Sequence, residues 1–319
     1  MDTTDDRIPL FQRLRPDTLE GVVGQDHLLG PNGPLERFGA GQPLSSLILW
    51  GPPGCGKTTL AFLLAKQNKR STFHALSAIT SGVSDLRPLF EGAAKDFQTD
   101  TQTILFVDEI HRFNRAQQDA FLPHMESGVI TLIGATTENP SFALNGALLS
   151  RCAVFALKSL DEDALKTLLK NAAIRLGSPL PLTPDGQDFL IKASGGDGRF
   201  LLRQVAALLT SKPPSGPADP DGVHRWTTDQ LQSLIQKKPA LYDKNQDMHY
   251  NLISVLHKAI RGSDVQAALY WFSRMIDGGE DPMYILRRLV RCASEDVGLA
   301  DPDALARVLA ARDAYQFLG

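Results

Sequence analysis

The segment Gly51–Thr58 (GPPGCGKT) has the residue types and spacing of a loop that holds phosphate groups. It fits the pattern G-x-x-x-x-G-K-[ST], and it lies between an apolar run, Leu47–Trp50, and a helix-forming run, Thr59–Lys66. Glycines let backbone N–H groups point at phosphate oxygens, and the N-terminus of the following helix adds positive potential. We therefore expect Lys57 to reach the β- and γ-phosphates of a nucleotide and the Thr58 hydroxyl to ligate Mg²⁺. A glycine-rich structural turn is the alternative interpretation.

Two carboxylates stand at the end of a second apolar run, Ile104–Val107. A buried strand that ends in acids places them outside the carboxyl edge of a sheet, where open α/β sheets bind ligands. We expect Asp108 to hold Mg²⁺ through its water shell and Glu109 to polarise the attacking water. Acidic residues after a strand would also suit a helix N-terminus, but the phosphate loop upstream favours the catalytic interpretation.

Polar residues also follow a third apolar run, Thr131–Ala135. A hydroxyl or amide at this strand end would lie between the two carboxylates and the γ-phosphate. The candidates for a residue that senses the γ-phosphate are Thr136, Thr137 and Asn139, and the sequence does not decide among them. A simple turn, which Asn139-Pro140 favours, is the alternative.

Two arginines are candidates for contact with a transferring phosphoryl group. Arg151 stands just before the apolar run Ala153–Leu157, and we expect it to act as an arginine finger supplied to a neighbouring subunit. Arg199 opens the helical run Phe200–Leu209, and we expect it to reach the γ-phosphate across a domain boundary. The alternatives are a surface ion pair for Arg151 and a solvated first-turn position for Arg199, which the helix dipole disfavours.

The elements that position these residues follow from short apolar runs. The runs expected to be strands are Leu47–Trp50, Thr72–Ala75, Thr103–Val107, Ile130–Ala135 and Ala153–Leu157. Runs this short that alternate with helical stretches are typical of buried parallel strands in an α/β sheet. After Leu160 the strand pattern stops. Helices are expected over Asp161–Leu176, Gly186–Ala193 and Phe200–Leu209, and from Thr227 or Thr228 to Gln236.

This pattern predicts the fold class and a division into three parts. An α/β P-loop NTPase core with a parallel sheet is expected at residues 1–158, an all-helical lid at 159–238 and a helical C-terminal part at 239–319. Within the last part, Gly278–Pro282 is expected to interrupt the helices. Arg287, Arg288 and Arg291 share one helical stretch there, and they would contact phosphate or, alternatively, form a solvated or inter-subunit face.

Composition narrows the classes of protein that fit. Hydrophobic residues make up 43% and charged residues 22% of the chain, as in ordinary globular proteins. The formal net charge of -3 is unlike that of a dedicated basic nucleic-acid binder, so DNA contact would be local or nucleotide-dependent. The three cysteines, Cys55, Cys152 and Cys292, have no CxxC spacing, which argues against a zinc site or disulfides and for a reducing, cytoplasmic setting. No apolar run approaches the ~18 residues of a membrane span, and the acidic N-terminus lacks the features of a signal peptide.

Taken in order, these segments resemble those of a AAA+ ATPase, and more narrowly the replication-associated recombination protein A family (MgsA, related to the eukaryotic Werner-helicase-interacting ATPase). The similar stretches are residues 13–30, 48–61, 106–142, 147–152 and 242–282, and the sequences IHRFNRAQQD and TTENPSF are the most specific. The resemblance implies that ATP hydrolysis with Mg²⁺ drives DNA or protein–DNA remodelling at stalled forks and gaps in replication, recombination and repair. The partners it implies are DNA forks, gaps and single/double-strand junctions, single-strand-binding protein, and further copies of the chain, as in bacterial tetramers. It places the protein at the bacterial nucleoid, with no membrane.

The resemblance also implies a role for each candidate residue. Gly51–Thr58 corresponds to the Walker A loop, Asp108 and Glu109 to the Walker B acids, and Thr136–Asn139 to sensor 1. Arg151 corresponds to a trans-acting finger, Arg199 to sensor 2, and Val22, Val23 and Gly24 to the segment near the adenine. The catalytic set is then Lys57, Asp108, Glu109, Thr137, Asn139, Arg151 and Arg199. The nucleotide-binding set is Val22, Val23, Gly51, Pro52, Pro53, Gly54, Cys55, Gly56, Lys57, Thr58, Thr59 and Arg199, with Thr58 and Asp108 at the Mg²⁺.

The sequence departs from the family pattern at two places. Cys55 stands where threonine is commoner, and because the position contributes mainly backbone, nucleotide binding is expected to survive. The chain ends at Gly319, whereas family members continue through a longer helical oligomerisation domain. We therefore expect part of that domain to be missing, whether the chain is cut or a natural short form. Tetramer formation and the use of Arg151 in trans depend on that domain.

Other functions fit parts of the pattern. Ser150–Cys152 would suit a clamp-loader-like subunit, and Gly134–Thr137 would suit a RuvB-like branch-migration ATPase. A nucleotide-switched scaffold with little turnover is a third possibility, against which Glu109 argues because a pure switch needs no acid to polarise water. His111 and Arg112 follow the two acids after Ile110, and a further hypothesis is that they couple nucleotide state to DNA or to a neighbour.

Overall fold

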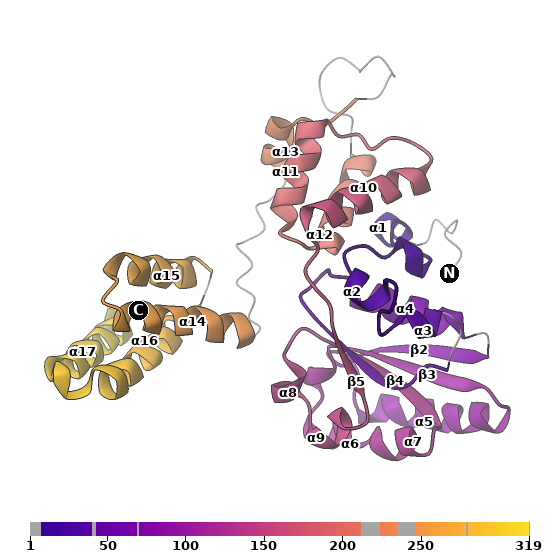
Figure 1. Ribbon diagram of the computed structural model, residues 1–319, viewed down its shortest axis with the longest axis horizontal. Helices are drawn as coiled ribbons and strands as arrows, with labels where there is room; N and C mark the ends of the chain where they lie inside the picture. The colour runs from indigo at the N-terminus through magenta and orange to yellow at the C-terminus, as the bar shows by residue number, and fades with distance from the viewer. Residues whose placement is uncertain are drawn as a thin grey trace. The chain divides into compact units, whose positions relative to one another are not determined.

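The computed structural model describes residues 8–39, 43–68, 70–211, 224–234, 246–278 and 280–318. The chain divides into two compact units, residues 1–236 and 237–319 (Figure 1). The first unit contains the sheet and a set of helices that follow it, and the second unit contains helices only among its described residues.

A five-stranded sheet lies at the centre of the first unit, in the order β2-β3-β4-β1-β5. The strands are β1 Leu47–Trp50, β2 Ser71–Ser77, β3 Gln102–Asp108, β4 Ile130–Thr136 and β5 Ala153–Ala156. All the pairings are parallel, which confirms the predicted fold class. Because β4 separates β1 from β3, the loop after β1 and the acids after β3 meet at the carboxyl edge of the sheet across the end of β4.

Apolar side chains that alternate along the strands pack against helices on both faces of the sheet. Leu47 and Leu49 of β1 join the cluster formed with α4, and Ile48 joins the cluster on the opposite face. Every residue of β4 is buried, as expected for a central parallel strand. The helices of this α/β part are α1 Leu10–Arg13, α2 Asp26–Leu29, α3 Glu36–Gly39, α4 Lys57–Gln67, α5 Val83–Gln98, α6 Arg115–Asp119, α7 Leu122–Glu126, α8 Pro140–Ala143 and α9 Gly146–Leu149, with the 3-10 turns η1 Leu19–Gly21 and η2 Ile110–Arg112.

Four helices follow the sheet and share a separate apolar cluster. They are α10 Glu162–Leu176, α11 Pro184–Ser194, α12 Gly198–Thr210 and α13 Thr228–Leu234. Side chains of Asp161, Thr183 and Asp197 cap the first three by accepting a hydrogen bond from a backbone N–H. Two of these helices start two residues before the predicted apolar runs, because periodicity does not mark the capped first turn. Gln236, the predicted end of the last helix, lies outside the described residues.

The second unit is built from helices around a small apolar core. They are α14 Gln246–Arg261, α15 Val265–Asp277, α16 Pro282–Arg291, the π-helical η3 Cys292–Val297, the 3-10 turn η4 Gly298–Ala300 and α17 Asp303–Leu318. The core consists of Leu252, Ile253, Leu256, Met275 and Ile285. The helices break between Asp277 and Pro282, as predicted. Within the described residues, no helix has both the length and the apolar character needed to cross a membrane.

Candidate functional site

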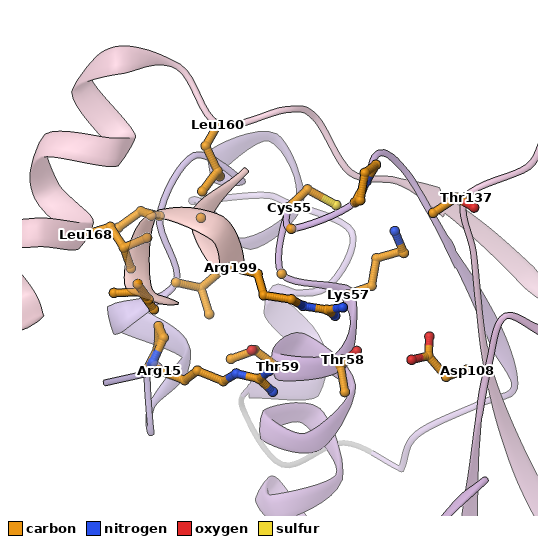
Figure 2. Close-up of a pocket in the computed structure, with 18 of the residues that line it drawn as sticks. Arg15, Cys55, Lys57, Thr58, Thr59, Asp108, Thr137, Leu160, Leu168 and Arg199 are labelled. Atoms are coloured by element: carbon orange, nitrogen blue, oxygen red, sulfur yellow. The ribbon is translucent and has the colours of Figure 1, made fainter. Parts of the chain in front are cut away.

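A cavity opens in the first unit where the loop after β1, the ends of β3 and β4, the N-terminal segment and α12 meet (Figure 2). Thirteen of the predicted site residues line it. They are Val22, Val23, Pro53, Gly54, Cys55, Gly56, Lys57, Thr58, Thr59, Asp108, Glu109, Thr137 and Arg199. Ten of the twelve predicted nucleotide-binding residues thus share one concave surface with Asp108, Glu109 and Thr137. The role of each of these residues stays a prediction.

The glycines of the loop after β1 make its path possible. Gly54 and Gly56 have φ angles of +70° and +106°, in the left-handed region that L side chains rarely adopt. A Cβ atom at Gly54 would lie 1.8 Å from Asp197 Oδ1. The backbone N–H of Gly198 also donates a 3.2 Å hydrogen bond to Gly54 O. The phosphate-type loop is therefore in direct contact with the beginning of α12.

Lys57 begins α4 and is buried at the base of the cavity. Its ammonium donates hydrogen bonds to the carbonyl oxygens of Gly51 (2.6 Å) and Pro52 (2.9 Å). Burial lowers the pKa of Lys57, and the carboxylates of Glu109 and Asp108 act in the opposite direction. Gly51 and Pro52 do not line the cavity, so they hold Lys57 through their carbonyls.

Gln25 braces the same loop and was not predicted as a site residue. It is 1% exposed, and its Nε2 donates to Cys55 O (3.3 Å) and Lys158 O (2.9 Å). The backbone N–H of Lys158 donates back to Gln25 Oε1 at 3.0 Å. One buried amide thus joins the loop to the segment that leaves β5.

The side chain of Cys55 takes no part, and burial raises the pKa of its thiol, so it stays protonated and unreactive at neutral pH.

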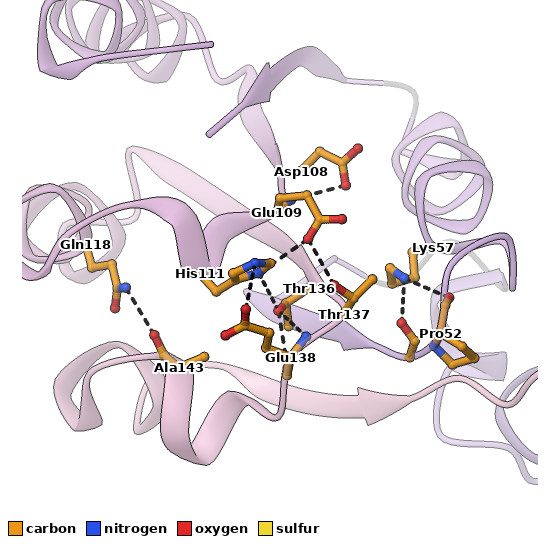
Figure 3. Close-up of polar contacts among 11 residues, drawn as sticks. Pro52, Lys57, Asp108, Glu109, His111, Gln118, Thr136, Thr137, Glu138 and Ala143 are labelled. Atoms are coloured by element: carbon orange, nitrogen blue, oxygen red, sulfur yellow. Dashed lines mark hydrogen bonds and ion pairs between the residues drawn. The ribbon is translucent and has the colours of Figure 1, made fainter. Parts of the chain in front are cut away.

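The two acids face the cavity from the end of β3. Asp108 is the last residue of that strand, and Glu109 follows it with a φ of +53°. This left-handed conformation is strained for a residue with a side chain, and it turns Glu109 out of the strand direction. Glu109 Oε2 accepts a 3.3 Å hydrogen bond from the Thr137 hydroxyl (Figure 3). The glutamate therefore lies between the cavity and the end of β4.

The end of β4 separates the three candidate sensing residues. Thr137 lines the cavity. Thr136 is fully buried and contacts His111 Nδ1 at 2.9 Å. Asn139 does not line the cavity, and its Oδ1 accepts a hydrogen bond from Ser141 N at the start of α8. The geometry favours Thr137 for contact with a ligand, and a sensing role for Asn139 stays a prediction.

Two guanidinium groups reach the cavity from different elements. Arg199, in the first turn of α12, extends toward Lys57 (Figure 2). Arg15, from the segment after α1, was not predicted to have a role. Burial lowers the pKa of Arg15, and the nearby charge of Arg199 lowers it further. The one sequence feature that could have indicated a role for Arg15 is its position before Pro16, a few residues before the segment predicted to lie near the adenine.

Arg151 lies outside this cavity, at the end of α9. Its guanidinium forms an ion pair with Glu126 and donates to Ala147 O at 2.9 Å. The side chain is 39% exposed. Arg151 thus does not reach the cavity of its own chain. A residue that acts on a neighbouring chain would have to lie outside its own cavity in this way, and its action on a neighbour stays a prediction.

The cavity has an apolar side and a polar side. Val22 and Val23 of the N-terminal segment face it together with Leu168 of α10, Leu202 of α12 and Leu160 from the segment before α10. The opposite side carries Lys57, Thr58 and the two acids. An apolar slot beside a cationic loop suits a ligand with a flat ring at one end and phosphates at the other.

Family models match most of the chain. Residues 47–160 match the ATPase family associated with various cellular activities (AAA). Residues 176–261 match a AAA C-terminal domain, and residues 262–319 match the MgsA AAA+ ATPase C-terminal domain. The first match contains the loop, both acids and the end of β4, so a single family accounts for the polar half of the cavity.

Several relatives match nearly the whole chain. It is 45% identical over 325 residues to the replication-associated recombination protein A of Coxiella burnetii. This match covers 99% of this chain and 71% of the relative's length. The replication-associated recombination protein A of Escherichia coli K12 is 43% identical to this chain. The match covers 98% of this chain and 70% of the relative's length. The ATPase WRNIP1 of Dictyostelium discoideum is also 43% identical over 98% of this chain, which spans 37% of that relative's length.

Among solved structures, the Thermotoga maritima RuvB Holliday junction branch migration motor has a similar fold. The TM-score is 0.50 and the sequence identity 23%, with 93% of this chain and 85% of the other covered. At this identity the likeness concerns the fold alone.

Proposed function

The chain belongs to the replication-associated recombination protein A family of AAA+ ATPases, and we propose that it couples ATP hydrolysis to the remodelling of DNA at stalled forks and gaps. Membership rests on identities of 43–45% to bacterial relatives of which the chain covers 70–71%. The ATPase assignment follows from the family. The DNA structure, the partners and the role of each residue belong to the proposal.

The observation that best supports ATP as the ligand is the convergence of three cations on one cavity. Lys57, Arg15 and Arg199 come from three different elements, and the interaction between the two arginines is repulsive. The acids Asp108 and Glu109 do not outnumber them. A triphosphate supplies negative charge between these groups, and it would replace repulsion by charge-assisted hydrogen bonds. The base would lie on the apolar side, against Val22 and Val23.

The oxygen ligands of the cavity also fit Mg²⁺. The Thr58 hydroxyl and the Asp108 carboxylate both line it, and hard oxygen donors are what Mg²⁺ takes, with water completing the shell. When bound there, Mg²⁺ would neutralise charge on the phosphate oxygens. The Glu109 carboxylate would accept a hydrogen bond from the attacking water and so polarise it. Lys57, Arg199 and the Arg151 of a neighbouring chain would stabilise charge on the transferring phosphoryl group.

Action on DNA is proposed from the relatives rather than from surface charge. Bacterial relatives are named for replication-associated recombination, whereas this chain has a formal net charge of -3. A uniformly basic surface is therefore excluded, and contact with DNA would be local. We further propose homo-oligomers, which the use of Arg151 in trans requires, and contact with single-strand-binding protein at the exposed strand.

The experiment is the steady-state ATPase rate of the chain with and without a forked DNA that carries a single-stranded gap. We expect clear stimulation by the fork and little by blunt duplex of the same length. Stimulation that is equal for the two DNAs would contradict the fork preference. A rate that no DNA changes would contradict DNA-coupled hydrolysis in this chain.

Glu109→Gln is the matched variant, since it keeps the size and hydrogen bonding of the side chain but removes its charge. We expect it to bind ATP and to lower kcat by about 100-fold or more. An unchanged rate would show that Glu109 does not polarise the water. A wild-type chain that binds ATP without turnover would instead favour the nucleotide-switched scaffold.

A further inference from the structure

His111 lies in a polar network directly behind Glu109 (Figure 3). It belongs to η2, the turn that follows β3, and its side chain is 4% exposed. Its Nδ1 is 2.9 Å from Thr136 Oγ1 and 3.3 Å from Glu109 Oε2. Its Nε2 is 3.4 Å from a carboxylate oxygen of Glu138. Burying an imidazole between two acids costs desolvation that an apolar side chain would avoid, so packing alone does not explain it.

The hydroxyl of Thr136 determines which way the hydrogen bond to His111 runs. Thr136 Oγ1 donates its single proton to Glu138 O at 3.2 Å and accepts from Glu138 N at 3.0 Å. It therefore has no proton left for the imidazole and must accept one from His111 Nδ1. The Nδ1–H group thus donates to the Thr136 hydroxyl, and the Glu109 carboxylate lies beside it at 3.3 Å. The end of β4 sets the orientation of the ring.

The two oxygens of Glu109 are not equivalent. Oε2 accepts a hydrogen bond from the Thr137 hydroxyl at 3.3 Å, and it also lies 3.3 Å from His111 Nδ1. Among the described residues, no hydrogen bond reaches Oε1, and Glu109 lines the cavity. A carboxylate anchored by one oxygen presents the other in a defined direction. This arrangement suits an acid that must orient a water molecule at a fixed place.

We propose that His111 is a positioning residue for Glu109, oriented in turn by Thr136 at the end of β4. The imidazole does not contact the ligand; it fixes one oxygen of Glu109 so that the other meets the attacking water. This inference rests on the proposed ATP hydrolysis at Glu109. It also connects that glutamate to β4, so that movement of this strand end would alter the rate without altering nucleotide affinity.

Electrostatics agrees with a neutral, donating imidazole. Burial lowers the pKa of His111, and the carboxylates of Glu138 and Glu109 oppose this effect. The net lowering of its pKa favours the uncharged ring at neutral pH. In this tautomer Nδ1 carries the one proton that the Thr136 hydroxyl requires, and Nε2 makes no hydrogen bond to the Glu138 carboxylate 3.4 Å away.

The test compares His111→Ala, His111→Asn and His111→Gln in the full chain. The Asn amide places an N–H donor near the position of Nδ1, whereas the Gln amide extends toward the position of Nε2. We expect His111→Ala to lower kcat about tenfold or more, with KM and the affinity for a fluorescent ATP analogue unchanged. His111→Asn should recover more of kcat than His111→Gln. His124→Ala is the control, since that ring stacks on Phe90 and does not contact Glu109.

A double variant separates positioning from a general loss of structure. If His111 acts through Glu109, adding His111→Ala to Glu109→Gln should cause no further loss of kcat. A structural role would lower the residual rate again and would reduce ATP affinity. If His111→Ala does not fold, the comparison of His111→Asn with His111→Gln decides the matter, and equal rates would overturn the proposal.

The two proposals fail in different ways. If the wild-type chain does not hydrolyse ATP under any condition, the proposed function is wrong and the role of His111 with it. If the wild-type chain is active and His111→Ala has the same kcat, only the positioning role is wrong.

Discussion

Consecutive residues at a strand end do different work because their side chains leave the strand on opposite sides. Thr136 faces inward, is fully buried and contacts His111, whereas Thr137 lines the cavity and contacts Glu109. The sequence predicted that one of three residues senses the ligand, but it did not decide among them. The alternation of side-chain directions along a strand predicts that Thr136 and Thr137 point to opposite sides. Only the packed sheet shows which of the two faces the cavity.

The contrast between Thr137 and Asn139 leads to the first prediction. Thr137→Val keeps the shape of the side chain but removes the hydroxyl that donates to Glu109, so kcat should fall about tenfold. Asn139→Ala removes the cap of α8 and should cost about 1 kcal/mol of stability, with little change in kcat. Steady-state kinetics and urea unfolding of both variants measure the difference. If instead Asn139→Ala abolishes turnover in a stable protein, Asn139 is the sensor.

At the scale of elements, the site arises because three strand ends meet. The predicted strands agree with the observed ones to within two residues, since apolar runs between turns mark them clearly. The loop after β1, the acids after β3 and the polar end of β4 could therefore be placed at one edge from the sequence. Arg15 and Gln25 could not, because they lie in irregular segments where no period fixes the direction of a side chain.

The contact between the loop and α12 leads to a prediction about Gly54. A side chain there would meet Asp197 and would also occupy a positive φ. We expect Gly54→Ala to weaken ATP binding at least tenfold and to lower stability by more than the ~1 kcal/mol of the backbone conformation alone. Nucleotide titration and urea unfolding measure both effects.

Gly92 provides the matched control within α5. Outside the backbone of α5 itself, no atom lies within 4 Å of a Cβ built there, so Gly92→Ala should stabilise the chain by about 0.4–1 kcal/mol and leave ATP affinity unchanged. If Gly54→Ala behaves like Gly92→Ala, the loop is not held against α12 in solution.

A half-buried histidine in the second unit, His257, leads to a prediction about pH. Burial lowers the pKa of His257, and Arg288 lowers it further, with Asp296 opposing and Arg261 adding to the effect. His257 Nε2 is buried without a hydrogen-bond partner among the described residues. As the pH falls below 6.5, the ordinary pKa of histidine, the unfolded chain therefore binds more protons than the folded chain. Stability should fall through that window and level off below the pKa of the folded state.

His257→Gln removes this titration and should make the stability of the second unit less dependent on pH. Urea unfolding followed by circular dichroism, at about pH 7.5 and about pH 5.5, brackets the window in which His257 is expected to titrate. An equal drop in stability for the wild type and for His257→Gln would mean that His257 is not the group responsible.

At the scale of the whole molecule, the predicted catalytic set is not confined to one place on the first unit, and Asn139 at the start of α8 lies outside the cavity. Lys57, the acids, Thr137 and Arg199 share the cavity, whereas Arg151 is held by Glu126 outside it. Sequence resemblance predicted a finger that acts in trans, and the isolated chain has the arginine in a place consistent with that prediction.

Mixing two inactive variants tests the trans role of Arg151. Lys57→Ala should not bind ATP productively, and Arg151→Ala should bind ATP but turn over slowly, because an arginine finger is worth about 10³-fold or more in rate. In a mixed assembly, an Arg151→Ala chain can receive the intact Arg151 of a Lys57→Ala neighbour. We therefore expect the mixture to be more active than the sum of the two variants, with a rate that rises with protein concentration. Activity equal to the sum at every concentration would mean that Arg151 does not act between chains, and the ion pair with Glu126 would then be its whole role.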